Sequence, residues 1–212
     1  MMQRHATIAL VAAVLGTAAL AAPAFAQAQQ IAGVTDESAG FYVGAGLGKA
    51  EHDGGCALPG ASISSCDDQD TAWKVYGGWQ LNKWLAAELA YVDFGEASFS
   101  GSTAGGGFSG ETETWGISAH AVGQFPIPIG ALDRLSVLGK LGTIWYDRER
   151  SSGGGFSGDD DGFAWAWGLG LQYTFGERVG VRGEWERYES VGSASVGEGD
   201  IDTWTISLNY KF

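Results

Sequence analysis

The sequence predicts an all-β fold, an eight-stranded antiparallel up-and-down barrel that crosses a membrane. The last twelve residues alternate apolar and polar side chains up to the terminal residue, as expected for a strand with one lipid-facing side. Seven further stretches alternate in the same way, and short and long connections follow one another strictly along the chain. The apolar set of the terminal strand is Trp204, Ile206, Leu208, Tyr210 and Phe212.

The first 26 residues have the composition of a secretory signal peptide. Arg4 precedes an apolar run over residues 6–20, and residues 24–26 form a small-x-small cleavage motif. The run is too short and too rich in alanine to cross a bilayer as a helix. We expect cleavage after Ala26, with Ala28 as the alternative, and one barrel domain over residues 27–212.

The predicted strands are long enough, at roughly 10–14 residues, to cross a bilayer at a tilt. Connections 81–83, 126–134 and 176–178 are short, whereas the other four are long and rich in glycine, serine and acid. This order is typical of a barrel with two unlike ends. The strands are predicted over residues 41–50, 71–80, 84–94, 112–125, 135–146, 163–175, 179–188 and 201–212.

The parity of the side chains distinguishes a membrane barrel from a soluble ligand-binding barrel. One face of the strands is bulky and apolar, and the other is small, polar or charged. The second set suits a narrow interior and the first suits lipid, with aromatic residues at the two interfaces. The expected belt residues are Trp73, Trp115, Trp145, Trp165 and Trp204 at the long-loop end, and Trp84, Tyr173, Phe175, Tyr210 and Phe212 at the short-turn end.

Composition and charge exclude several classes of protein. The chain has 35 glycines, 9 tryptophans and a formal net charge of −13, which argues against a nucleic-acid partner because that needs a basic surface. It contains no phosphate loop, no nucleotide-binding glycine pattern and no metal-spaced cysteine set. We therefore expect no cofactor, no metal and no enzymatic activity.

Several segments carry a family resemblance in order and spacing. They are FYVGAGLG at 41–48, KVYGGWQLN at 74–82, ELAYVDFG at 88–95, GKLG at 139–142, RGEW at 182–185 and the terminal strand. In these the chain resembles the OmpA-like family of small outer-membrane barrels. The resemblance implies the outer membrane of a Gram-negative bacterium, periplasmic termini and outward-facing long loops. It also implies that the barrel-assembly machinery recognises the terminal strand. Because the chain stops at the barrel, without a peptidoglycan-binding domain, we do not expect a role in cell-wall tethering.

Five charged residues share the predicted interior face, most of them near mid-depth. Charges removed from water must pair or be hydrated, so we expect a salt-bridge network across the lumen. In resembling proteins such a network plugs the barrel or gates a narrow pore by exchanging partners. We favour the plug, because eight strands leave just enough width for side chains. The network residues are Lys74, Glu88, Lys140, Arg182 and Glu184.

Ser118 and His120 offer a weaker alternative, a lipid A-modifying enzyme. Some outer-membrane deacylases combine a histidine, a serine and an acid on a small barrel. The order here is reversed, both side chains are predicted to face the lumen, and no third group is evident to orient the base. We therefore predict no catalytic residues.

Cys56 and Cys66 both fall in the first long loop. Two cysteines this close in an exported chain predict a disulfide that orders the loop. A metal site with His52 and Asp53 is the alternative, but the set falls short of a zinc signature.

The long loops hold most of the acidic residues, and two of them repeat the segment GGGFSG at 105–110 and 153–158. The acidic residues form either a solvated crown or a binding surface. Such a surface would bind either lipopolysaccharide phosphates, through divalent cations, or an unidentified host or surface ligand. The repeat is either a shared contact site or the result of drift or hairpin duplication in flexible loops. We predict a structural or surface-interaction protein, with a narrow pore as the alternative.

Overall fold

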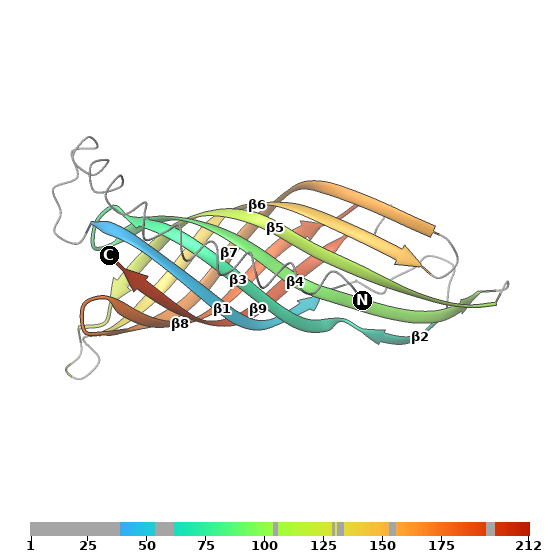
Figure 1. The fold of residues 1–212 in the computed structure, drawn as a ribbon, viewed down its shortest axis with the longest axis horizontal. Helices are drawn as coiled ribbons and strands as arrows, with labels where there is room; N and C mark the ends of the chain where they lie inside the picture. Colours follow the sequence, from blue (N-terminus) through green and yellow to red (C-terminus); the bar gives the residue numbers. More distant parts are fainter. Residues whose placement is uncertain are drawn as a thin grey trace.

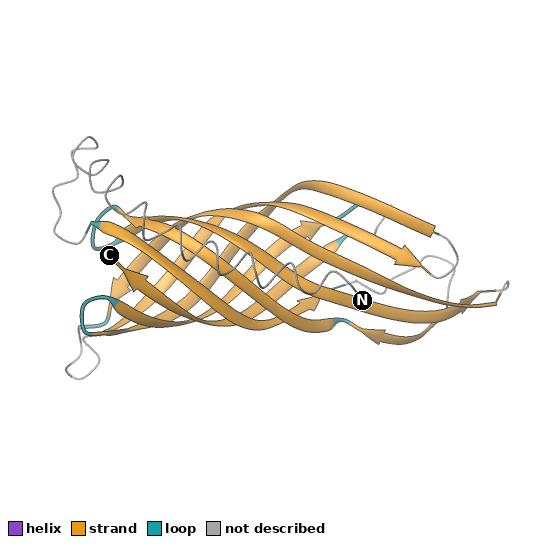
Figure 2. Ribbon diagram, viewed as in Figure 1, coloured by secondary structure: helices purple, strands orange, loops and turns teal. Residues whose placement is uncertain are grey.

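The computed structural model describes residues 39–53, 62–103, 106–128, 130, 134–152, 156–193 and 198–212. Eight antiparallel strands close into a barrel, and the pairing of β4 with β5 completes the ring (Figures 1 and 2). This confirms the predicted fold class. The barrel strands are β1 (Gly40–His52), β3 (Gln69–Gln80), β4 (Leu85–Thr103), β5 (Gly106–Pro126), β6 (Leu135–Ser152), β7 (Phe156–Phe175), β8 (Val179–Val191) and β9 (Gly199–Lys211).

The two faces of each strand follow the predicted parity. Side chains of the apolar set point outward, and Leu47, Ile206 and Leu208 are each more than 60% exposed. Small, polar and charged side chains point into the lumen, where most are buried. A barrel whose outer surface is its apolar surface is solvated by lipid. Among the residues described, no helix is long and apolar enough to cross a membrane.

Aromatic rings line the outer surface at both ends of the barrel. At the long-hairpin end Trp73, Tyr91, Trp115 and Trp145 contact one another in sequence across four neighbouring strands, with centroid separations of 5.3–5.6 Å. At the short-turn end the pairs are Trp84–Phe125, Tyr173–Phe175 and Tyr210–Phe212. The rings therefore occupy the levels expected for interfacial belts.

The prediction of flexible loops between residues 94 and 112 and between residues 146 and 163 is wrong. Both segments continue as strands, so β4 with β5 and β6 with β7 form long hairpins that rise beyond the barrel (Figure 1). A short strand, β2 (Ser62–Asp67), was also not foreseen, and it pairs with the extension of β4. We call these projecting parts of β2 and of β4–β7 the wall. Their small and polar side chains obscured the alternation that marks a strand.

A β-bulge separates the barrel part of β4 from its extension. Gly95 has a φ of +73°, and its N–H donates a hydrogen bond of 3.0 Å to Asp93 Oδ1. Asp70 accepts a hydrogen bond of 2.8 Å from the N–H of Glu96 and packs against Gly95, where a Cβ atom would collide with it. The bulge shifts the parity of β4, so that odd-numbered Ala97 and Phe99 face inward. The extension of β4 therefore turns apolar side chains to the inner side of the wall.

The described parts of the GGGFSG repeat lie at equivalent places. Residues 106–110 begin β5 and residues 156–158 begin β7, each just after the tip of a long hairpin. The described residues of the repeat therefore belong to strands and not to flexible loops.

Tyrosine rings fill the lumen at positions where the facing residue has no side chain. The ring of Tyr76 lies over Gly44, and the ring of Tyr42 lies over Gly78, its neighbour across the same pair of strands. A Cβ atom on either glycine would overlap the ring. These glycines make room for two large side chains in a narrow barrel.

Candidate functional site

A cluster of six charged side chains crosses the middle of the lumen, and their side chains are at most 3% exposed. We call it the charge cluster. The strand parity places all of them on the inner face, and the pairing of the strands brings them together from four sides. Its members are Lys74 on β3, Glu88 on β4, Lys140 on β6, and Arg182, Glu184 and Glu186 on β8.

The two lysines connect the three carboxylates. Lys140 Nζ lies 2.6 Å from Glu88 Oε1, 2.6 Å from Glu184 Oε1 and 3.1 Å from Glu186 Oε1. Lys74 Nζ lies 2.6 Å from Glu184 Oε2 and 2.5 Å from Glu186 Oε2. Each ammonium group is thus surrounded by carboxylate oxygens, which a buried charge requires.

Arg182 joins the cluster to the side chains below it. Its Nη1 donates a hydrogen bond of 2.8 Å to Glu88 Oε2, and its Nε donates one of 3.0 Å to Gln172 Oε1. The hydroxyl of Tyr42 donates to the same Glu88 oxygen at 2.9 Å. The guanidinium also lies 4.9 Å from the ring centroid of Tyr76. Hydrogen bonds and ring contacts therefore hold the cluster in place.

The structure brings together all five predicted network residues and adds Glu186. Three cations now face three carboxylates, so the cluster has no formal net charge. Glu186 shares the parity of Arg182 and Glu184 on β8, but the predicted network did not include it. An uneven count of three cations against two carboxylates was the signal that could have identified the missing acid.

An aromatic contact spans the lumen beyond the charge cluster, toward the wall. Phe94 on β4 and Tyr188 on β8 come from opposite sides of the barrel, and their rings meet edge to face at 4.9 Å. Both residues are 0% exposed. Above them Arg148 donates a hydrogen bond of 2.8 Å to the carbonyl of Val191, which ties β6 to β8 across the opening. We call the Phe94–Tyr188 pair the aromatic lid.

A small polar vestibule lies on the other side of the charge cluster, at the short-turn end. Its volume is about 160 Å³, and Arg182 lies on its inner side. Gln80, Gln124, Gln172 and Asn209 line it. Water can therefore approach the cluster from the short-turn end but meets buried ion pairs there.

Ser118 and His120 lie inside the barrel as predicted and are buried. Neither side chain makes a hydrogen bond within the described part of the chain, so they do not form a nucleophile–base pair there. No group of three or more potential metal ligands occurs among the described residues. Cys56 and the side chain of Cys66 lie outside the described part, as does the predicted signal peptide.

The outer side of the wall carries a row of carboxylates. Glu96, Glu113, Glu149 and Asp159 are register partners on four neighbouring strands, and all are exposed. Partial burial and the adjacent carboxyl of Glu96 raise the pKa of Glu113. Like charges placed directly opposite one another destabilise a sheet, so this row is costly without a counter-charge.

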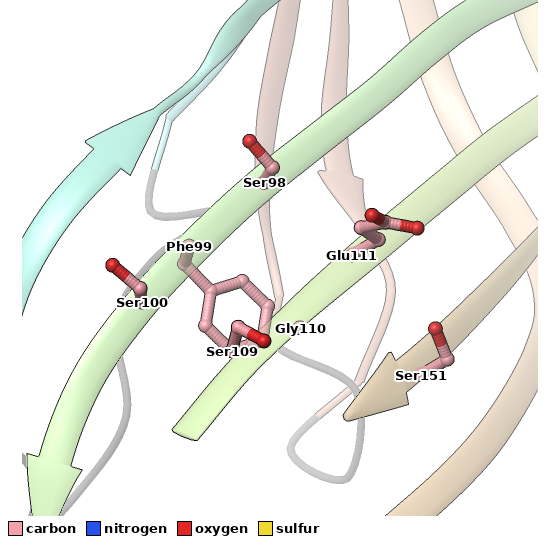
Figure 3. Close-up of a pocket in the computed structure, with 7 residues that line it drawn as sticks. All are labelled: Ser98, Phe99, Ser100, Ser109, Gly110, Glu111 and Ser151. Carbon is pink, nitrogen blue, oxygen red and sulfur yellow. The ribbon is translucent and has the colours of Figure 1, made fainter. Parts of the chain in front are cut away.

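Beyond this row the wall bears a shallow depression of about 400 Å³. Figure 3 shows its side chains coming from β4, β5 and β6, with small hydroxyl groups and one carboxylate around Gly110. Its lining is Ser98, Phe99, Ser100, Ser109, Gly110, Glu111 and Ser151.

A closed barrel with a lipid-facing apolar outer surface and buried ion pairs across its lumen defines the class of small membrane-spanning β-barrels. Within that class the chain belongs to the outer membrane protein beta-barrel domain family, whose model matches residues 12–212. It is 22% identical over 178 residues to outer membrane protein A of Shigella flexneri, which covers 81% of this chain. The chain spans about half the length (48%) of that relative.

Solved structures share the fold. Neisserial surface protein A has a TM-score of 0.58 at 16% identity, covering 83% of this chain and all of the other. OprG of Pseudomonas aeruginosa has a TM-score of 0.52 at 15% identity, with 84% and 99% covered. The barrel domain of OprF from the same organism has a TM-score of 0.50 at 14% identity, with 82% and 98% covered. The first of these is named as a surface protein and the second as an outer membrane protein.

Proposed function

We propose that this protein is a closed barrel of the Gram-negative outer membrane that displays the wall on the cell surface and does not conduct solutes. Residues 1–26 direct export and are removed, the short turns lie in the periplasm, and the wall lies outside. N-terminal sequencing of the mature protein tests the first step, with Gln27 as the expected first residue.

The observation that carries the closed state is the burial of the charge cluster. All its side chains are at most 3% exposed, and its charges balance. A conducting lumen would keep such charges hydrated. A neutral, desolvated set that fills an eight-stranded barrel supports a plug.

Planar-bilayer conductance of the refolded chain tests this role, with folding checked by the gel mobility shift between unboiled and boiled samples. The wild type is expected to give no discrete current steps. Currents that change with Lys140→Ala, but not with the matched turn variant Lys83→Ala, would instead establish a pore.

The pore remains the second candidate because Lys140 contacts three carboxylates. A cation with several acceptors can exchange partners without losing all of its ion pairs. The enzyme alternative has no comparable support, since Ser118 and His120 are buried in the lumen, away from a lipid substrate.

The surface role rests on the outer row of Glu96, Glu113, Glu149 and Asp159. We propose that divalent cations link these carboxylates to lipopolysaccharide phosphates, which offsets the repulsion within the row. The row lies just beyond the aromatic belt, at the level of lipid headgroups.

Binding of the refolded barrel to lipopolysaccharide-containing vesicles, with Mg²⁺ or with EDTA, tests this interaction. Glu113→Gln with Glu149→Gln should weaken the Mg²⁺-dependent binding. The turn variant Glu177→Gln should leave it unchanged. Binding that ignores both EDTA and the paired substitution would contradict the cation bridge.

A further inference from the structure

Two layers of buried side-chain contacts span the lumen. The charge cluster forms the first, nearer the short-turn end. The aromatic lid of Phe94 and Tyr188 forms the second, nearer the wall, and both its residues are 0% exposed. Phe94 and Tyr188 stand on β4 and β8, which are four strands apart in either direction around the ring. Their contact therefore spans the full width of the barrel.

The strand register fixes the space between the two layers. On the β4–β5 pair, Glu88 of the charge cluster is opposite His120, and Ala90 is opposite Ser118 one inward row further on. Gly116 follows in the next row, where Ile144 leans over it. Phe94 is the next inward residue of β4 after Val92. Ser118 thus lies between the charge cluster and the lid.

This intermediate layer mixes the apolar side chains of Val92 and Ile144 with polar ones. Ser118 Oγ, both ring nitrogens of His120 and the hydroxyl of Tyr188 are buried and have no hydrogen-bond partner among the described residues. Buried polar atoms of this kind are normally satisfied by ordered water. The intermediate layer therefore holds polar groups that water can satisfy, whereas the lid above it brings two aromatic rings into contact.

We infer that the aromatic lid is a second, hydrophobic seal, in series with the charge cluster, and that each seal alone keeps the lumen closed to ions. This inference rests on the closed lumen of the proposed function. A constriction lined by apolar groups excludes ions by expelling water, so it needs no charge to block conduction. Loss of the charge cluster then exposes the intermediate layer from one side only.

Two seals in series give a signature that one seal cannot. Opening either seal makes the intermediate layer accessible, but only opening both makes the lumen conduct. The substitution Ser118→Cys reports whether a thiol reagent reaches the intermediate layer. The native cysteines are removed by Cys56→Ser and Cys66→Ser. The reagent is ethylammonium methanethiosulfonate, applied to the refolded chain in detergent micelles, where both ends of the barrel are open to solvent.

The reporter is expected to react at least about tenfold more slowly in the folded barrel than in the unfolded chain, because a closed layer protects it. Phe94→Ala and Lys140→Ala should each restore fast labelling. The matched variant Phe94→Leu keeps an apolar lid and should stay protected. The gel mobility shift confirms that each variant is folded.

Conductance completes the test. Phe94→Ala and Lys140→Ala should each be silent in planar bilayers, and the double variant should conduct. The inference would be overturned by fast labelling of the folded Ser118→Cys reporter with an intact lid and charge cluster, or by slow labelling of the reporter in Phe94→Ala. Currents from Lys140→Ala alone, or no current from a folded double variant, would also overturn it. Currents from the wild type would instead contradict the closed barrel itself.

Discussion

Glu88 and Arg182 stand on opposite sides of the barrel, on β4 and β8, yet Arg182 Nη1 lies 2.8 Å from Glu88 Oε2. A direct ion pair across the full lumen is feasible because an eight-stranded barrel is narrow and because both side chains are long. The ion pair therefore joins opposite sides of the barrel through its interior, in addition to the strand pairing around the ring.

Removal of one partner of this pair should cost more than removal of both. Glu88→Ala leaves Arg182 buried without its main counter-charge, and the expected loss of unfolding free energy is about 3–5 kcal/mol. Adding Arg182→Ala should restore part of that loss. Urea titration of the vesicle-reconstituted barrel measures both, with the turn variant Glu177→Ala as the control. Equal, additive losses would show that the two side chains are not coupled.

Gly78 should tolerate no side chain. A Cβ atom there would overlap the ring of Tyr42, so Gly78→Ala should lose about 1–3 kcal/mol of unfolding free energy through overpacking. Gly183 faces lipid, and a Cβ atom there would have no atom within 4 Å, so Gly183→Ala should be nearly neutral. In a Tyr42→Ala background the cost of Gly78→Ala should shrink, and an unchanged cost would rule out the ring as its cause.

The carboxylate row should make the wall more stable in mild acid. The raised pKa of Glu113 means that the folded wall holds this proton more tightly than the unfolded chain does. Stability should therefore fall as the pH rises from the ordinary glutamate value of 4.5 through the higher pKa of the folded state. Glu113→Gln should flatten this dependence, as measured by hydrogen exchange of β4 and β5 residues beyond the belt. A slope that persists in Glu113→Gln would assign it to another group.

The terminal phenylalanine should matter for assembly more than for the finished fold. The side chain of Phe212 is 46% exposed on the outer surface, while its N–H donates a backbone hydrogen bond of 2.9 Å to Phe41. Phe212→Ala should lower the yield of assembled barrel in cells but leave refolding in detergent unchanged. Phe125→Ala removes another exposed ring near the same end and is the control. Equal yields for the two variants would argue against a special role in recognition by the assembly machinery.

The barrel and its two faces could be predicted from the sequence because both follow from alternation. Tyr210 and Phe212 at the chain end, and Trp84 beside a short turn, already marked one interface. The same parity placed Lys74, Glu88 and Lys140 in the lumen, where pairing was the physical requirement.

The rest depended on long-range geometry. Nothing local to Phe94 or Tyr188 indicates that their rings meet across the barrel, since that contact depends on strand order, tilt and the bulge at Gly95. The extended hairpins were missed because serine and glycine occupy many of their outward positions, which leaves little hydrophobic contrast to read.

The projecting hairpins limit how the exposed surface of this protein can diverge. Along them, outward residues such as Ser98 and Glu111 alternate with inward residues such as Ala97 and Thr112. Insertion of one residue would exchange the two sets, whereas insertion of two would preserve them. Sequence divergence along these hairpins should therefore leave substitutions at every second position and length changes in even steps.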